Sequence, residues 1–139
     1  MKVLKKRTML GLAIMLVGVA ILLYGVYNAL TIEYVETNIP NIVANGFVPI
    51  TIGIVILING IVTQGVRNYY ALVIHLIANI PYAVAIIGIN GLGQQTTPPT
   101  DPQEYVMATL IYWIIGAIFN IGGIIANRYA KKEPAKQAP

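Results

Sequence analysis

Three residues with usable chemistry lie close together in an otherwise apolar stretch, NYYALVIHLIANIPYAVAIIGI, which covers residues 68–89. His75 has an imidazole and Asn79 has a carboxamide. Pro81 has no backbone N–H, so the carbonyl one turn earlier in the helix loses its usual donor. We expect Asn79 or a trapped water to satisfy that carbonyl. Such a group of residues either forms a working site or holds helices together.

Two more asparagines are expected to join this group. At about 100° per residue, His75, Asn79 and Asn120 all fall beside the small residues of their own helices, so they face protein rather than lipid. Counted from the polar residues that end each apolar run, His75, Asn120 and Asn59 lie at similar depths, the first two about 10–12 Å inside. The sequence therefore predicts an intramembrane polar layer of Asn59, His75, Asn79 and Asn120. Structural pairing of the helices and a ligand, quinone or permeation site are both compatible with it.

Most enzyme chemistry has no residues to support it. The chain has no cysteine and a single histidine, which excludes thiol catalysis, thiolate metal sites and bis-histidine haem. No nucleophile and base can meet within the apolar segments. We therefore predict a protein that is not an enzyme and has neither a cofactor nor a metal.

Charged residues are also missing from the apolar segments, where ion-coupled transporters usually carry one. In length and number of spans the chain resembles the small multidrug exporters, but those depend on a glutamate in the first span, which is absent here.

Small residues recur at every seventh position in all four apolar segments. A seven-residue period keeps one stripe on a helix face, and small residues let helices approach closely in lipid, with crossing angles of about +20°. We predict that these stripes are the helix-packing surfaces. Their members are Gly11, Gly18 and Gly25; Gly46, Gly53 and Gly60; Ala71, Ala78 and Ala85; and Thr109, Gly116 and Gly123.

The elements that must position these residues are membrane helices. Of the 139 residues 57% are hydrophobic and only 10% are charged, with a mean hydropathy of +0.72, whereas soluble domains are about 25% charged. We expect an all-α integral membrane protein with four transmembrane helices in an up-down bundle. The spans are expected at about residues 9–30, 42–63, 69–89 and 102–127, within one domain of residues 1–130. Span two either begins near Asn41 and bends at Pro49, or begins near Asn45.

The distribution of charged residues predicts how the chain is oriented in the membrane. All nine basic residues precede span one, lie between spans two and three, or follow span four, whereas four of the five acidic residues occupy the other two connections. The positive-inside rule places both termini in the cytoplasm of a multi-pass cell-membrane protein. We expect anionic lipid head groups, not nucleic acid, at Lys5, Lys6, Arg7, Arg128, Lys131 and Lys132. We expect residues 131–139 to form a basic cytoplasmic tail, and abundant isoleucine suggests a thermophile.

Span two provides the main indication of a partner. Asn59 lies about 140° around the helix from the glycine stripe, so two opposite sides look specialised for contact. We therefore expect a non-catalytic accessory or structural subunit of a larger membrane complex, such as a respiratory or other bioenergetic one. A small homo-oligomeric channel or carrier for a neutral solute or anion, lined by His75, Asn79 and Asn120, is the alternative. A third possibility is a quinone- or lipid-contacting module that uses His75 with Tyr82 or Trp113.

Overall fold

The computed structural model describes residues 2–130, with the side chains of residues 8–129. The described chain is helical, and four of its helices are long and apolar enough to cross a membrane: Thr8–Thr31, Glu36–Gly65, Tyr69–Gly93 and Pro102–Tyr129. Each contains the segment expected from the sequence. The tail of residues 131–139, with the lipid contacts expected at Lys131 and Lys132, and the side chains of residues 5–7 lie outside the described part.

Helix α1 (Lys2–Thr31) is followed by a segment that changes its helical pitch several times. A 3₁₀ turn, η1 (Glu36–Asn38), leads into α2 (Ile39–Ile42), a π-helical turn η2 (Val43–Phe47) and α3 (Val48–Gly65). Span two therefore begins at Glu36, earlier than either expected start. The wider π turn ends at Phe47, two residues before Pro49.

Pro49 cannot donate to the carbonyl of Asn45, four residues earlier. The side chain of Asn28, on α1, replaces that donor, with Nδ2 3.0 Å from the Asn45 oxygen. An unpaired carbonyl in lipid costs several kcal/mol. This bond therefore lets the second span continue through Pro49 while it also ties that span to α1.

The last two long helices have side-chain caps. Asn68 accepts a hydrogen bond from the backbone of Tyr70 at the start of α4 (Tyr69–Gly93). Asp101 accepts one from the backbone of Gln103 at the start of α5 (Pro102–Ala130). Asparagine and aspartate caps satisfy donors that the first helical turn leaves free. The Asp101 cap lies where the sequence predicted the start of span four.

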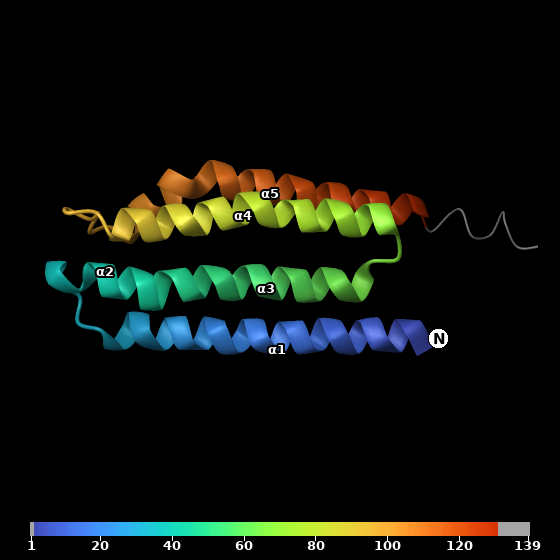
Figure 1. Ribbon diagram of the computed structural model, residues 1–139, viewed down its shortest axis with the longest axis horizontal. Coiled ribbons are helices and arrows are strands. Elements are labelled where there is room, and N and C mark those ends of the chain that lie inside the picture. Colours follow the sequence, from blue (N-terminus) through green and yellow to red (C-terminus); the bar gives the residue numbers. More distant parts are fainter. Residues whose placement is uncertain (1, 131–139) are drawn as a thin grey trace, which may run out of the picture.

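The four long helices form two tightly packed antiparallel pairs. Helix α1 packs along α3, and α4 packs along α5, whereas the contact between α3 and α4 is much smaller. Among the described residues α1 has no comparable contact with α4 or α5. Figure 1 shows α1, α3 and α4 following one another across the molecule. The up-down order is as expected, but the helices form an open row of two hairpins rather than a closed ring around one core.

Glycines hold the first hairpin together. Gly11 lies against Gly60, Gly18 against Gly53, and Gly25 against Gly46. A Cβ atom added at Gly53 would come within 2.8 Å of the Gly18 carbonyl oxygen and 2.7 Å of the Leu22 nitrogen. The two backbones are therefore in direct contact, which only residues without a side chain permit.

Glycines in the second hairpin receive aromatic rings instead. The ring of Tyr82 lies over Gly116, and the ring of His75 lies over Gly123. The alanine stripe of α4, Ala71, Ala78 and Ala85, is completely buried. The seven-residue period is thus used in both hairpins, although the second packs glycine against a ring rather than against glycine.

A small apolar cluster joins the hairpins near one end of the molecule. Ile39, Val43, Ile89 and Tyr105 are at most 3% exposed and pack together, with Phe47 set edge-on against Tyr105 at 5.8 Å between ring centroids. Val43 also fills the space above Gly93. Through Tyr105, α5 packs in this cluster against Ile39 and Val43 of the second span.

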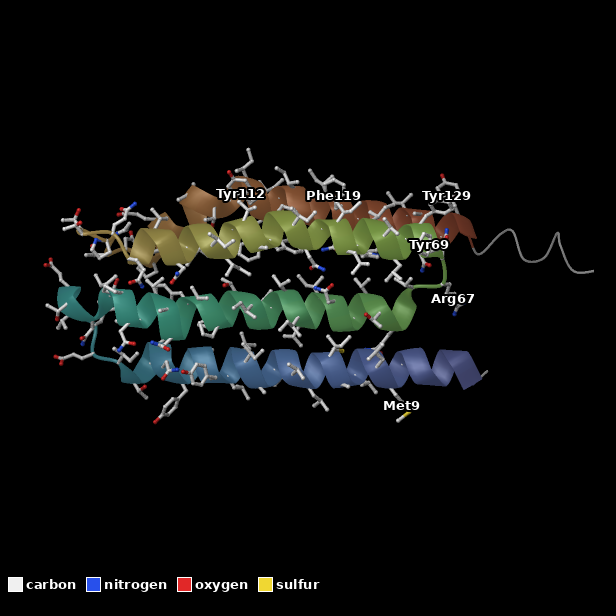
Figure 2. The ribbon with its side chains drawn as sticks, in the orientation of Figure 1. Met9, Arg67, Tyr69, Tyr112, Phe119 and Tyr129 are labelled. Carbon is white, nitrogen blue, oxygen red and sulfur yellow. The ribbon has the colours of Figure 1, made fainter. Side chains whose placement is uncertain are left out.

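The outer surface of the row is apolar. Large hydrophobic side chains are exposed along α1, α4 and α5; Leu16 and Ile87, for example, are each 71% exposed. Figure 2 shows Tyr112 and Phe119 projecting outward from α5. Such a surface suits contact with lipid chains and would be costly in water.

The two ends of the row differ in charge. One end of the row, the basic end, holds the start of α1 and the turn between α3 and α4, which contains Arg67 (Figures 1 and 2). Arg128, near the end of α5, lies at the same end. Glu33, Glu36, Asp101 and Glu104 lie in or beside the connections at the opposite, acidic end. Tyr69, Tyr70 and Tyr129 are more than 70% exposed at the basic end, as expected of aromatic residues at a lipid–water boundary.

Candidate functional site

The predicted polar layer is present but divided between two helix interfaces. Between α3 and α4, Asn59 and Asn79 form a reciprocal amide pair, with N–O distances of 2.8 and 2.9 Å. The second hydrogen of the Asn59 amide goes to the Val55 carbonyl, at 2.8 Å. This pair is a side-chain link between the two hairpins.

The other half of the layer lies between α4 and α5. His75 is 4% exposed, and its Nδ1 lies 2.8 Å from Oδ1 of Asn120. The Asn120 amide nitrogen in turn donates to the hydroxyl of Tyr82. In this arrangement the His75 Nδ1–H donates to Asn120, and Nε2, which carries no proton in the neutral ring, lies over Gly123.

An aromatic and hydroxyl chain continues from Tyr82 towards the acidic end. The Tyr82 and Trp113 rings lie 5.5 Å apart between centroids, tilted by 35°. The indole nitrogen of Trp113 donates to Thr109, whose hydroxyl donates to the Tyr105 carbonyl at 2.8 Å. Trp113, which was considered for a quinone site, is therefore held within the α4–α5 interface.

One of the two partners expected for the carbonyl freed by Pro81 is bonded elsewhere. The Asn79 amide, which was expected to satisfy that carbonyl on Ile77, is bonded to Asn59 instead. An amide shared across two helices satisfies both side chains at once, whereas a bond back to its own helix would leave Asn59 short of a partner.

Each of the four residues in the layer has at least one side-chain hydrogen bond within the chain. No buried side-chain nitrogen or oxygen in residues 8–129 lacks one. In addition, no three of the described histidine, aspartate and glutamate side chains are close enough together to hold a metal ion. The arrangement joins α3 to α4 and α4 to α5 through these side-chain bonds.

Two polar links in the structure were not predicted from the sequence. Asn28 bonds the Asn45 carbonyl, and Asn127 near the end of α5 accepts from the Arg67 backbone at 2.8 Å and donates to the Gly65 carbonyl at 2.8 Å. Both asparagines lie near helix ends, where polar residues are common, so their type alone did not set them apart. The signal available for Asn28 was the proline in the following span, which requires a donor from elsewhere.

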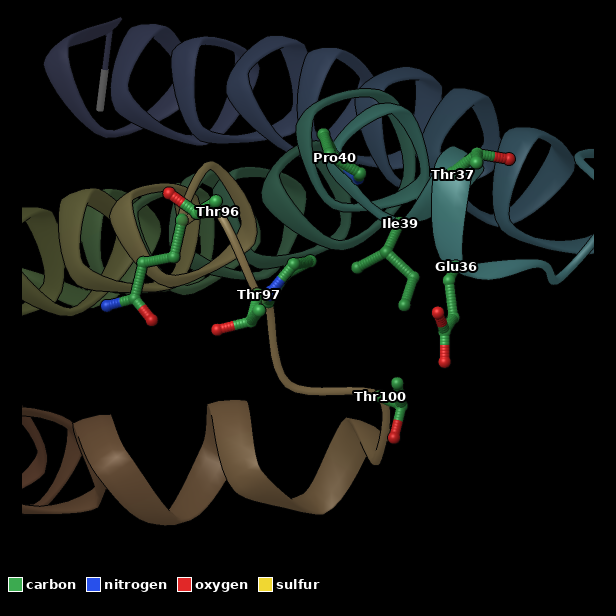
Figure 3. Close-up of a pocket in the computed structure, with 9 residues that line it drawn as sticks. Glu36, Thr37, Ile39, Pro40, Thr96, Thr97 and Thr100 are labelled. Atoms are coloured by element: carbon green, nitrogen blue, oxygen red, sulfur yellow. The ribbon is translucent and has the colours of Figure 1, made fainter.

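A second candidate site is a pocket of about 420 Å³ at the acidic end. It lies between the start of the second span and the loop that joins α4 to α5, as Figure 3 shows. Ile39, which is buried, is one of its lining residues. The remaining lining residues are Glu36, Thr37, Pro40, Gln95, Thr96, Thr97, Pro98 and Thr100.

Hydrogen bonds fix both walls of this pocket. Gln94 donates from Nε2 to the Pro40 carbonyl at 3.1 Å, which ties the loop to α2. The Tyr105 hydroxyl donates to the Pro99 carbonyl at 2.7 Å. Asn38 donates to the Glu33 carbonyl at 3.0 Å. The loop region is thus bonded to the second span through Gln94 and to α5 through Tyr105.

Comparisons with known proteins leave the function to be argued from the chain itself. No family model matches it, and no curated protein or solved structure is significantly similar to it.

Proposed function

We propose that this protein is a non-catalytic structural or accessory subunit of a larger membrane assembly. The observation that carries this proposal is that each of the four residues of the polar layer is bonded to another group of the same chain. A channel or carrier needs polar groups that are free to replace the hydration of a solute. Here Asn59, Asn79, His75 and Asn120 are all bonded to one another or to neighbouring groups.

The two-sided character of the second span no longer supports a partner. Its glycine stripe faces α1, and Asn59 faces Asn79 on α4, so both specialised sides are used within the chain. This follows from the open row, in which α3 has a neighbour on each side. The support for a partner comes instead from the outer helices, since α1 packs extensively on α3 alone and α5 chiefly on α4.

The orientation proposed for the protein places the basic end in the cytoplasm of a cell membrane. The support is the separation of charge between the two ends. Under this orientation the basic flanks meet anionic lipid head groups. Single cysteines in place of Arg67 and Thr100 test it in intact cells with a membrane-impermeant maleimide. Labelling at position 100 alone is expected, and labelling at position 67 alone would overturn the orientation.

Purification in mild detergent, followed by mass spectrometry of the intact particle, tests the subunit proposal. Stable association with different polypeptides is expected. A lone symmetric oligomer that conducts a neutral solute or an anion in liposomes would refute it and support the channel. The variant His75→Ala separates the two further. Under the proposal it lowers stability and assembly, whereas loss of flux with unchanged stability would contradict a structural role.

A further inference from the structure

We propose that the pocket at the acidic end binds a primary ammonium group, carried either by a small free amine or by the head group of an ethanolamine phospholipid. This proposal does not depend on whether the protein is a subunit. It concerns the opposite end of the spans from the basic flanks, and a pocket that the polar layer does not reach.

The size of the pocket suits a small organic ligand. Its volume of about 420 Å³ falls within the range of about 300–1,000 Å³ that is usual for ligand pockets. Both walls are already fixed by the bonds of Gln94 to Pro40 and of Tyr105 to Pro99. A pocket whose walls are fixed before binding loses less conformational entropy when a ligand enters.

The charge around the pocket favours a cation. Glu36 is the charged residue of its lining, and Glu33, Asp101 and Glu104 lie at the same end. No lysine or arginine lies at this end of residues 2–130. Like charges gathered in one region raise the local concentration of the opposite ion. In Figure 3 the Glu36 carboxylate points towards the side of the pocket on which Thr100 lies.

The other polar groups of the lining match a primary ammonium. Such a group has three donors and no acceptor. The pocket offers one carboxylate, and its lining also includes the hydroxyl groups of Thr37, Thr96, Thr97 and Thr100. Ile39 and two prolines add apolar surface for the carbon atoms next to the nitrogen.

Two other kinds of cation fit less well. Quaternary ammonium groups are recognised by aromatic cages, and no aromatic side chain lines the pocket. Calcium takes six to eight oxygen ligands, usually with several carboxylates among them, whereas this lining supplies one. A primary ammonium is therefore the cation that this lining matches.

The full-length protein in phosphatidylcholine nanodiscs provides the test, with butylammonium as the probe and calorimetry as the measurement. Butylammonium is expected to bind, whereas butanol and tetramethylammonium should bind at least tenfold more weakly. The variant Glu36→Gln should weaken butylammonium binding about tenfold, the usual effect of losing one charge-assisted hydrogen bond. Thr97→Val provides a second, milder variant, with an expected loss of about threefold.

Glu33→Gln is the matched control, because it removes the same charge from the same end without altering the lining of the pocket. Its affinity should stay within about twofold of the unmodified protein. If Glu36→Gln and Glu33→Gln weaken butylammonium binding equally, the cation is attracted by the overall negative charge of this end. That result would overturn binding in the pocket. Butanol, tetramethylammonium or calcium binding as well as butylammonium would overturn the choice of ligand.

Nanodiscs that contain phosphatidylethanolamine distinguish the two sources of the ammonium. If the lipid head group occupies the pocket, free butylammonium binds more weakly in these discs than in phosphatidylcholine. That difference then disappears in Glu36→Gln. If the pocket takes a free amine, the two kinds of disc give the same affinity.

Discussion

Two adjacent glycines on α5 provide a direct test of how the second hairpin is packed. Gly123 lies under the His75 ring, where an added Cβ atom would come within 2.6 Å of Nε2 and 2.7 Å of Cε1. At Gly122 an added Cβ would meet only Ile74, at an ordinary 3.8 Å. Gly123→Ala should therefore destabilise the protein, and Gly122→Ala should not.

The size of the effect follows from these distances. To restore an ordinary contact of 3.4 Å, the ring has to retreat from α5 by about 0.8 Å, and close-packed interiors resist such shifts. Because Asn120 is on the same helix as Gly123, that retreat stretches the 2.8 Å bond from His75 beyond hydrogen-bonding distance. Overpacking costs about 1–3 kcal/mol, and a lost interhelical hydrogen bond about 0.6 kcal/mol. We expect a total loss of about 2–3 kcal/mol from the free energy of unfolding.

Reversible unfolding by sodium dodecyl sulfate in mixed micelles, followed by circular dichroism, measures this difference. Gly122→Ala should leave the free energy of unfolding unchanged or raise it by up to about 1 kcal/mol, since alanine favours helix over glycine. The variant His75→Ala in the Gly123→Ala background should relieve part of the overpacking. The packing of His75 on Gly123 would be refuted if Gly123→Ala were as stable as Gly122→Ala.

Other variants test the remaining interfaces in the same unfolding assay. Gly53→Ala should cost about 1–3 kcal/mol because it forces α1 and α3 apart, and an unchanged free energy of unfolding would contradict their direct backbone contact. Asn59→Leu or Asn79→Leu alone should destabilise more than both together, because each single change leaves one amide unpaired in lipid; additive losses would argue against the pair. Asn28→Val should cost about 1–2 kcal/mol by leaving the Asn45 carbonyl unsatisfied, and a neutral result would show that the π turn satisfies this carbonyl without Asn28.

Much of the local structure could be predicted from the sequence. A run of about 20 apolar residues has few alternatives to a spanning helix. The four long helices were therefore predictable from the four apolar runs. Asp101 and Pro102 marked the start of α5 because each suits one position at a helix start. The positions of polar and small residues around each helix followed from helical geometry, which is the same for every sequence.

The order of the helices could not be predicted in this way. Angular positions show that Asn59 and the glycine stripe lie on different sides of the second span, but not which helix covers each side. In the open row, α1 covers one side of the second span and α4 covers the other. The two contact sides that suggested an external partner are therefore both used inside the chain. The bond from Asn28 to the Asn45 carbonyl was hidden for the same reason, since it requires the distance between two helices that only the packed structure provides.

The row also has a consequence for biosynthesis. Each long helix packs mainly on a neighbour that is adjacent along the polypeptide, with α1 against α3, α3 against α4, and α4 against α5. The first hairpin can close its glycine contacts before the ribosome has made α4, since nothing in that interface waits for a later segment. Synthesis from the N-terminus would thus build the molecule by stepwise addition, and a chain stopped after Gly65 should already hold its first two helices together in the bilayer.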